Sequence, residues 1–201
     1  MFDALIIGAG AAGMSCALVL GSAKDKSFAQ GKQIGIIAHQ KTSHLQNALF
    51  NNVLGLMPGT TGEDILEKGP KQLTDLYPHI QQIETEKVRG VSGEKEAFTV
   101  TTNKNTYRAK LVVIAVGYTK FFTIKGLDEH IIPHSRTIAE KERIQLKNED
   151  HLVKPGLYVA GTLAGWRSQY AMACGSGSHV ATDILTLWNN GKHTKVHDKT
   201  Q

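Results

Sequence analysis

Apolar residues open the chain, and a glycine-rich stretch follows them directly. Residues 2–7 are apolar apart from Asp3, which predicts a strand that is buried on both faces of a parallel sheet. The glycine-rich residues 8–13 lead into an apolar helix that we expect to run to about Leu20. After a polar segment, residues 33–38 again favour a strand. The pattern therefore predicts one βαβ unit of about 37 residues, an ordinary size for that motif.

The remaining chain shows no internal repeat and mixes helical with extended patterns. A helix is predicted from residue 62 or 63 to about residue 77, and the acids Glu63 and Asp64 suit its positive N-terminal end. The elements predicted after Pro78 are short meander strands at 83–91, 97–102 and 107–109, a buried parallel strand at 111–116, a core strand at 157–160 and a helix at 178–188. We therefore expect an α/β fold with three layers, in which helices cover one face of a central parallel sheet and the β-meander covers the other.

The composition is ordinary for a globular protein and excludes several classes. Of the 201 residues, 41% are hydrophobic and 20% are charged, which favours one domain over disorder or a coiled coil. We assign residues 1–190 to this domain, with 118–150 as a short linker, and residues 191–201 to a flexible polar tail. The net charge of +5 is spread along the chain, so we expect no nucleic-acid partner.

The uncharged residues 4–20 raise the question of a membrane segment. Gly8, Gly10 and Gly13 interrupt this stretch, and no Lys or Arg precedes it as in a signal peptide. A spanning helix also needs about 20 consecutive apolar residues. We therefore expect no membrane association and a cytoplasmic location, which the presence of only two cysteines also favours.

The spacing of Gly8, Gly10 and Gly13 matches the GxGxxG pattern of dinucleotide-binding turns. The first glycine allows a tight turn, the second lets the backbone approach a diphosphate, and the third lets the helix pack on the strand. The helix N-terminus then offers unpaired N–H groups and a partial positive charge to the phosphates. Because the pattern lies between a predicted strand and a predicted helix, we expect these glycines, with Ala11 and Ala12, to bind a nucleotide cofactor.

The end of the second predicted strand lacks the acid that commonly binds the adenosine ribose. Ala38 occupies that place, and His39, Gln40 and Lys41 follow it. Two arrangements are open: the backbone and Gln40 serve the ribose, or His39 and Lys41 bind a 2′-phosphate as in an NADP site. His39 can equally be an exposed loop histidine without a ligand.

Several motifs resemble, in their order, the FAD domain of the thioredoxin reductase-like family within the pyridine nucleotide-disulfide oxidoreductases. They are Asn52-Val53-Leu54-Gly55 followed by Gly62-Glu63-Asp64-Ile65-Leu66, then Ala115-Val116-Gly117, residues 155–161 and residues 169–177. The resemblance implies an FAD/NAD(P)-binding Rossmann-like fold and FAD as the cofactor. It also implies that Asn52 faces the flavin, that the Val88 backbone contacts adenine, and that a helix start after Gln169 meets the flavin. The complete candidate cofactor-binding set is Gly8, Gly10, Ala11, Ala12, Gly13, Ala38, His39, Gln40, Asn52, Val88, Ala115, Val116, Gly117, Gly161, Thr162, Gln169, Tyr170 and Ala171.

Three departures from that family bear on function. The family inserts an NADPH domain where this chain has residues 118–150. A single βαβ unit takes about 30 residues or more, so this segment is too short for a whole dinucleotide-binding domain. The family's CxxC dithiol is also absent, so we do not expect this polypeptide alone to reduce thioredoxin by the family mechanism. Thr162 stands where the family has Asp, and losing carboxylates here and at Ala38 would weaken FAD binding by about 2–3 kcal/mol. Two outcomes are open: tight FAD binding through the many retained backbone contacts, or weak or absent flavin.

Histidine spacing gives no metal site. His130 and His134 are four residues apart, as are His193 and His197, but the first pair flanks Pro133 in a predicted loop and the second lies in the tail. Neither pair presents a rigid ligand face, so we assign no metal-ligating residue.

The predicted function is that of an FAD-dependent oxidoreductase that has no disulfide of its own and obtains electrons from free NAD(P)H or a partner protein. Cys174, which the resemblance puts near the flavin, is the single candidate catalytic residue, whereas Cys16 is expected to be a core thiol. Two alternatives are a non-enzymatic flavin- or nucleotide-binding sensor or subunit, and an NADP(H)-binding protein. A homodimer is also allowed.

Overall fold

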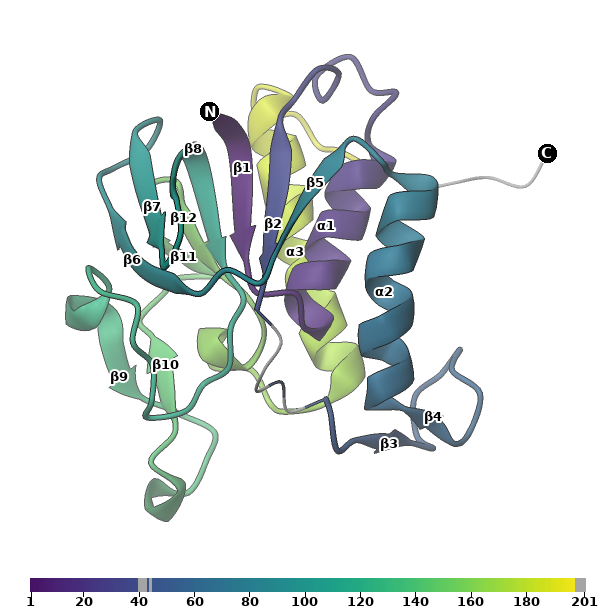
Figure 1. Ribbon diagram of the computed structural model, residues 1–201, viewed down its shortest axis with the longest axis vertical. Helices are drawn as coiled ribbons and strands as arrows, with labels where there is room; N and C mark the ends of the chain where they lie inside the picture. The colour runs from purple at the N-terminus through teal and green to yellow at the C-terminus, as the bar shows by residue number, and fades with distance from the viewer. Residues whose placement is uncertain (40–42, 44, 198–201) are drawn as a thin grey trace.

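A central sheet runs through the protein, with helices packed against one face and a smaller β layer against the other (Figure 1). The computed structural model describes residues 1–39, 43 and 45–197. Five neighbouring strands are parallel, in the order β12 (Leu157–Val159), β8 (Thr106–Ile114), β1 (Phe2–Ile7), β2 (Ile34–Ala38) and β5 (Ile80–Glu84), and β11 (Leu152–Lys154) adds an antiparallel strand at one edge.

The residues of β1 alternate between the two faces of the sheet. Ala4 and Ile6 pack against the helices, whereas Leu5 and Ile7 pack against the opposite β layer. All four are at most 2% exposed, as the period of two requires for a strand that is covered on both faces. The same alternation continues in β2 and β8, so the sheet separates two apolar cores. The predicted α/β fold with a central parallel sheet is confirmed.

Three helices form the layer on one face: α1 (Ala11–Ser22), α2 (Gly62–Leu76) and α3 (Tyr170–Trp188). The first is apolar nearly all round because the sheet, α2 and α3 surround it. The second begins at the predicted place, where Thr61 and Asp64 form a capping box: each side chain accepts the other residue's backbone N–H at 3.1 Å.

The last helix begins at Tyr170 rather than at residue 178, where the residue pattern alone predicts it. Gly175 and Gly177 lie inside it, and glycines lower the helix propensity of the segment. Packing explains one of them, because a Cβ at Gly177 would lie only 1.9 Å from the carbonyl oxygen of Ala12 in α1. Contact with α1 therefore outweighs local propensity here.

The second β layer is smaller than the sequence predicts. It contains β6 (Val88–Ser92) and β7 (Phe98–Thr102), which pair antiparallel, and β7 also pairs with the first half of β8. The single strand predicted at 83–91 is wrong, because β5 ends at Glu84 and pairs in parallel with β2. The strands predicted at 107–109 and 111–116 form one strand, β8. Its first half pairs antiparallel with β7, and its second half pairs in parallel with β1.

Residues 118–150 form a lobe beside the sheet (Figure 1). In it β9 (Ile131–Pro133) and β10 (Ile144–Leu146) make an antiparallel pair, with short 3-10 turns at Asp128–His130 and Ala139–Lys141. Strands of three residues are too short to produce a period that sequence analysis can detect. A further short pair, β3 (Leu49–Phe50) with β4 (Thr60–Thr61), precedes α2.

The chain packs back on the helix layer after α3. Thr194 is buried, and Val196 packs against the core between helices and sheet. Of the segment predicted as a polar tail, Thr194 and Val196 thus contact the domain, and residues 198–201 lie outside the described part. Within the described ranges, every helix is too short or too polar to cross a membrane.

The carboxylate of Asp3, the one charged side chain of β1, is held by three groups. The Gln33 N–H donates to Oδ2 at 2.9 Å, Lys110 Nζ donates to Oδ1 at 2.9 Å, and Lys32 Nζ lies 3.7 Å from Oδ1. Burial raises the pKa of Asp3, but the Gln33 hydrogen bond and the two lysines outweigh burial and lower this pKa below its ordinary value.

Replacing Asp3 with Asn should remove a pH-dependent part of the stability. Because the pKa of Asp3 is lower in the folded than in the unfolded chain, the carboxylate stabilises the fold above about pH 4 and ceases to as the pH falls through the folded pKa. We expect Asp3→Asn to lower the free energy of unfolding by about 1–2 kcal/mol at neutral pH. Urea unfolding from neutral to acidic pH should show this deficit shrinking, with Asp75→Asn, an exposed acid of α2, as the neutral control. A deficit that stayed constant at every pH would contradict the assignment.

Candidate cofactor site

The C-terminal ends of the parallel strands meet at one edge of the sheet, and turns leave each strand there (Figure 1). Backbone hydrogen bonds link these turns to neighbouring strands: Gly8 N–H to Ile37 O (3.0 Å), Ala115 N–H to Ile7 O (2.8 Å) and Ala160 N–H to Ile114 O (2.9 Å). The turns after β1, β8 and β12 therefore form one connected floor. This edge is the usual ligand position in open α/β sheets.

The three glycines of the GxGxxG turn differ in what a side chain at each position would meet. Gly8 has a φ of +107°, and a Cβ on it would lie 2.5 Å from the Ala115 carbonyl oxygen. A Cβ on Gly13 would lie 1.8 Å from the Gly8 oxygen, so α1 packs on the strand end only with glycine there. A Cβ on Gly10 would meet no atom within 4 Å. The outer two glycines are required by the fold, and the middle one faces space that a ligand could fill.

The N-terminus of α1 offers hydrogen-bond donors at this open space. Gly10 is the N-cap residue and no side chain caps it. The first intrahelical bond runs from the Met14 N–H to the Gly10 oxygen at 2.9 Å, so the N–H groups of Ala11, Ala12 and Gly13 have no partner within the helix. With the positive end of the helix dipole, these groups suit a diphosphate.

Residues from two later turns complete this floor. A Cβ on Gly8 would lie 3.1 Å from Val116 Cγ1, and one on Gly161, whose φ is +77°, would lie 3.0 Å from Ala12 Cβ. Gly117 follows Val116 directly and is exposed. The structure thus brings together predicted site residues that are more than a hundred positions apart in the sequence.

One side of the site begins where β2 ends. Ala38 is half-buried and His39 is exposed, whereas the predicted Gln40 lies outside the described residues. The Thr85 N–H donates to the Ala38 oxygen at 3.1 Å, and Val88 starts β6 three residues later. The register also pairs Ala38 with the exposed Glu84 of β5. Sequence reasoning missed this carboxylate because it assigned residues 83–91 to the meander.

The other side of the site lies between the turn after β12 and the start of α3. Thr162 belongs to a 3-10 turn at Gly161–Ala164 and is half-buried. Gln169 is the N-cap of α3, and the Tyr170 ring lies 4.9 Å from the Phe50 ring between centroids. That contact brings the loop of the exposed Asn52 to the start of α3, where Ala171 is exposed as well.

The two cysteines differ in their surroundings. Cys16 is buried between the sheet and helices, and burial raises the pKa of its thiol, which makes it unreactive. Cys174 is half-buried one turn after Tyr170 in α3. Burial, followed by the neighbouring Cys174, raises the pKa of the Tyr170 phenol. Cys174 therefore lies near the predicted flavin side without a second thiol as a redox partner.

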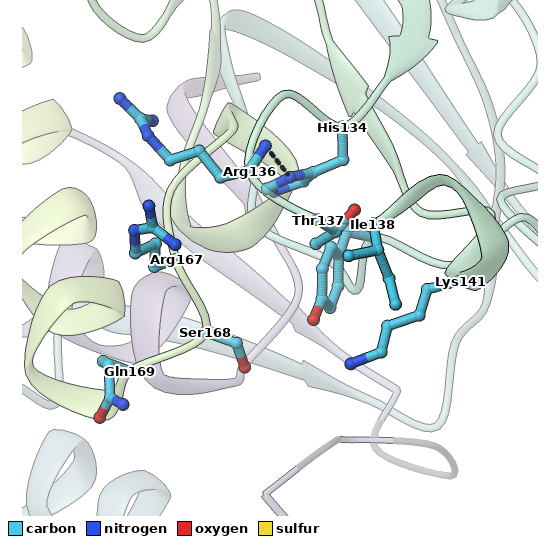
Figure 2. Close-up of a pocket in the computed structure, with 9 residues that line it drawn as sticks. His134, Arg136, Thr137, Ile138, Lys141, Arg167, Ser168 and Gln169 are labelled. Atoms are coloured by element: carbon cyan, nitrogen blue, oxygen red, sulfur yellow. Dashed lines mark hydrogen bonds between the residues drawn. The ribbon is translucent and has the colours of Figure 1, made fainter.

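A pocket of about 370 Å³ opens beside the start of α3 (Figure 2). Residues of the 118–150 lobe and of the turn before α3 line it: Tyr118, His134, Arg136, Thr137, Ile138, Lys141, Arg167, Ser168 and Gln169. The Arg136 and Arg167 side chains lie on one side, and the Lys141 ammonium reaches in from the opposite side. These described lining residues include no Asp or Glu, so the pocket is electropositive and suits an anion.

Buried His134 joins the lobe to the turn that carries Thr162. Its Nδ1 accepts the Arg136 backbone N–H at 3.1 Å, and its Nε2 lies 3.1 Å from the Thr162 carbonyl oxygen. A carbonyl oxygen can only accept, so Nε2 donates and the ring is a neutral tautomer with both nitrogens satisfied. Arg136 Nη1 adds a second link by donating to the Gly165 oxygen at 2.6 Å. The cationic side of the pocket is therefore fixed against the predicted flavin side.

A parallel α/β sheet, a glycine turn and an uncapped helix N-terminus with open space before it define a nucleotide-binding protein of the Rossmann type. Residues 2–177 match the family described as pyridine nucleotide-disulphide oxidoreductase, and the chain belongs to that family. The resemblance inferred from the short motifs is confirmed.

Named relatives agree with this assignment. The chain is 26% identical over 207 residues to a protein named ferredoxin–NADP reductase from Levilactobacillus brevis, a match that covers 100% of this chain and 54% of that protein. The chain thus spans about half the length of that relative. It is also similar to the structure of a thioredoxin reductase from Gloeobacter violaceus, with a TM-score of 0.70, 14% identity, and 100% of this chain and 98% of that chain covered. It is also similar to the structure of a ferredoxin-flavin thioredoxin reductase from Clostridium acetobutylicum, with a TM-score of 0.67 and 19% identity. That match covers 94% of this chain and 98% of the other. At these identities the structural likeness shows a shared fold.

Alanine at the middle glycine and at the last glycine of the turn should separate the needs of the ligand from those of the fold. Gly10→Ala should change the free energy of unfolding by less than about 1 kcal/mol, yet weaken binding of ADP at least tenfold, because its methyl group enters the ligand's space. Gly13→Ala should destabilise the fold by about 2 kcal/mol or more, because the backbone must move. Thermal unfolding and ADP titration measure both effects.

The matched control is Gly90→Ala in β6, where a Cβ would make an ordinary contact of 3.5 Å with the Lys125 oxygen. It should leave ADP binding unchanged. Unchanged ADP affinity in Gly10→Ala would show that the nucleotide does not bind at this turn.

Proposed function

We propose that this protein is an FAD-dependent oxidoreductase that binds FAD across the strand ends and receives electrons from a donor in the pocket of Figure 2. The observation that carries the proposal is the presence, at one edge of the sheet, of an open diphosphate cradle and an electropositive pocket. Family membership supports redox chemistry.

The candidate residues form three groups, each of which binds a different part of FAD. Backbone N–H groups at the start of α1 hold the diphosphate. The adenosine lies toward Ala38 and Val88, and the flavin lies toward Thr162, Gln169 and Tyr170. Bound FAD supplies a centre that accepts electrons from one partner and passes them to another. The chain's own part is to orient the flavin and to hold the donor beside it.

Neutral groups replace two carboxylates that commonly hold this cofactor. Glu84, in register with Ala38, offers a carboxylate to the adenosine ribose from the neighbouring strand. At the flavin end, the Thr162 hydroxyl replaces the carboxylate. A hydrogen bond between neutral groups contributes about 0.5–1.5 kcal/mol, whereas one to a charged group contributes about 1.5–3 kcal/mol. We therefore expect tight binding of FAD, somewhat weaker than two carboxylates would give.

The pocket favours a donor that carries phosphates. Arg136, Lys141 and Arg167 provide three positive charges, and NADPH carries one phosphate more than NADH. We therefore propose NADPH as the preferred donor, in agreement with the L. brevis relative, whose name includes NADP. A partner electron-transfer protein with an acidic surface is the alternative donor. The absence of a CxxC pair in this sequence makes a separate electron acceptor necessary for thioredoxin-like chemistry.

The test begins with the cofactor itself. Acid release and chromatography of the purified protein, reloaded with FAD where needed, should yield FAD and no NADP. Anaerobic NADPH should then bleach the flavin absorbance faster than NADH does. If dithionite reduces the flavin but neither NADPH nor NADH does, the electron donor would be a partner protein. A protein that retains no flavin after loading would refute the proposal, and loaded protein without turnover on any acceptor would favour a sensor.

Neutralising the pocket should impair use of the donor without releasing FAD. We expect Lys141→Gln and Arg167→Gln each to raise KM for NADPH about fivefold, equivalent to about 1 kcal/mol for a partly exposed charge contact. The effect should shrink at high salt, because exposed charges are screened. Stopped-flow reduction measures it, with Lys71→Gln on α2 as the control. Equal KM values in all three variants would mean that the donor binds elsewhere.

A further inference from the structure

Two histidines from distant parts of the sequence meet where the start of β11 packs on α3. His151 lies in the turn before β11 and His179 lies in α3, and their rings stack with centroids 4.8 Å apart at 26°. Asp150 adjoins His151, and Asp183 lies one helical turn after His179. These four side chains, here called the His151 cluster, are separate from the residues assigned to the cofactor.

A tight hairpin presents Asp150 and His151 to the helix. Glu149 and Leu152 exchange backbone hydrogen bonds at 2.9 and 2.8 Å, which leaves Asp150 and His151 as the two loop residues. Their φ angles are 43° and 72°, the left-handed values that such a turn requires and that glycine or asparagine usually supplies. The His151 N–H donates to Asn148 Oδ1 at 3.0 Å. The turn is therefore fixed in a conformation unusual for its residue types.

Inside this cluster, two imidazole nitrogens lack hydrogen-bond partners. The His151 side chain is 1% exposed, and its Nε2 lies 2.8 Å from Ser176 Oγ. Within the described part of the chain, its other nitrogen, Nδ1, has no hydrogen bond, and neither has Nε2 of His179. Buried polar atoms normally have partners. The pair of unsatisfied nitrogens thus points to a ligand between them.

The distances across the cluster fit a metal ion better than direct hydrogen bonds. Asp150 Oδ1 lies 3.6 Å from His151 Nδ1 and 3.5 Å from His179 Nε2. Asp183 Oδ2 lies 3.4 Å from His179 Nε2. These separations exceed ordinary hydrogen bonds, but they approach the roughly 3.3–3.4 Å between two donors that are each about 2.0–2.1 Å from a tetrahedral Zn²⁺. One ligand atom each from Asp150, His151 and His179 lies within 4.8 Å of the others.

We propose that Asp150, His151 and His179 bind one Zn²⁺ or similar divalent transition-metal ion, with Asp183 as a fourth ligand. Two imidazole nitrogens with carboxylate oxygens favour zinc over calcium or magnesium, which take oxygen ligands. Nδ1 of His151 binds the ion. The ion joins the β11 turn to α3 and has a structural role.

Ser176 orients the buried ligand. With Nδ1 on the metal, His151 Nε2 carries the proton and donates to Ser176 Oγ, which also accepts the Gly161 N–H at 2.7 Å. The two lone pairs of the hydroxyl oxygen allow both bonds, and such a partner commonly fixes the ring of a metal-binding histidine.

A purely ionic network explains the cluster less well. Ion pairs of His179 with Asp150 and Asp183 would still leave the buried Nδ1 of His151 without a hydrogen-bond partner. Neutral rings provide the lone pairs that a metal ion binds.

The test is a titration of the chelator-treated full chain with Zn²⁺, followed by calorimetry, and with Co²⁺, followed by visible absorbance. We expect one ion per chain and, for Co²⁺, the intense bands of tetrahedral coordination. His179→Ala should weaken Zn²⁺ binding at least a hundredfold, and Asp183→Asn about tenfold. Zn²⁺ should raise the melting temperature of the wild type but not of His179→Ala.

The control is His193→Ala, which disrupts the exposed pair His193/His197 and should leave Zn²⁺ binding unchanged. Circular dichroism checks folding, and if His179→Ala unfolds, Asp150→Asn, which changes an exposed carboxylate, replaces it with an expected loss of at least tenfold. No binding to the wild type would overturn the proposal. The proposal would also be overturned if a folded cluster variant bound Zn²⁺ as tightly as the wild type, or if only His193→Ala lost Zn²⁺ binding. Either result would mean an adventitious ion only.

Discussion

The close approach of backbone to backbone at Gly13 and Gly177 determines where α1 begins, and the site depends on that position. A Cβ at Gly13 would lie 1.8 Å from the Gly8 oxygen, and one at Gly177 would lie 1.9 Å from the Ala12 oxygen. The first turn of α1 is therefore held between the end of β1 and α3. This steric constraint has an electrostatic consequence, because it fixes uncapped N–H groups beside the open space at Gly10.

The rest of the site is attached to this fixed point by hydrogen bonds. Bonds between backbone groups join the turns after β1, β8 and β12, and His134 and Arg136 attach the 118–150 lobe to Thr162 and Gly165. Under the proposed function, a short lobe rather than an inserted nucleotide domain presents the electron donor to the flavin. Donor specificity then rests on three exposed cations, which is why salt and single neutral substitutions should alter it.

Local patterns were sufficient for the βαβ unit and the glycine turn, because an apolar run and the sterics of glycine act within a few residues. Features that arise from long-range pairing were not predictable in the same way. Glu84 was missed because a strand at its position fits a meander or a parallel sheet equally well, and only pairing with β2 decides. The residue pattern did not predict the first half of α3, because Gly175 and Gly177 lower its helix propensity. Packing of this segment on α1 nevertheless favours a helix there. His151 and His179 are 28 residues apart and meet only through the packing of β11 on α3.

Titration of the cofactor-free protein with FAD, ADP and riboflavin tests most directly whether the start of α1 binds a diphosphate. The expected result is one FAD per chain, displacement of FAD by ADP, and no measurable binding of riboflavin, which shares the flavin ring but has no phosphate. Failure to bind FAD, or binding of riboflavin as tightly as FAD, would contradict the central role assigned to the glycine turn.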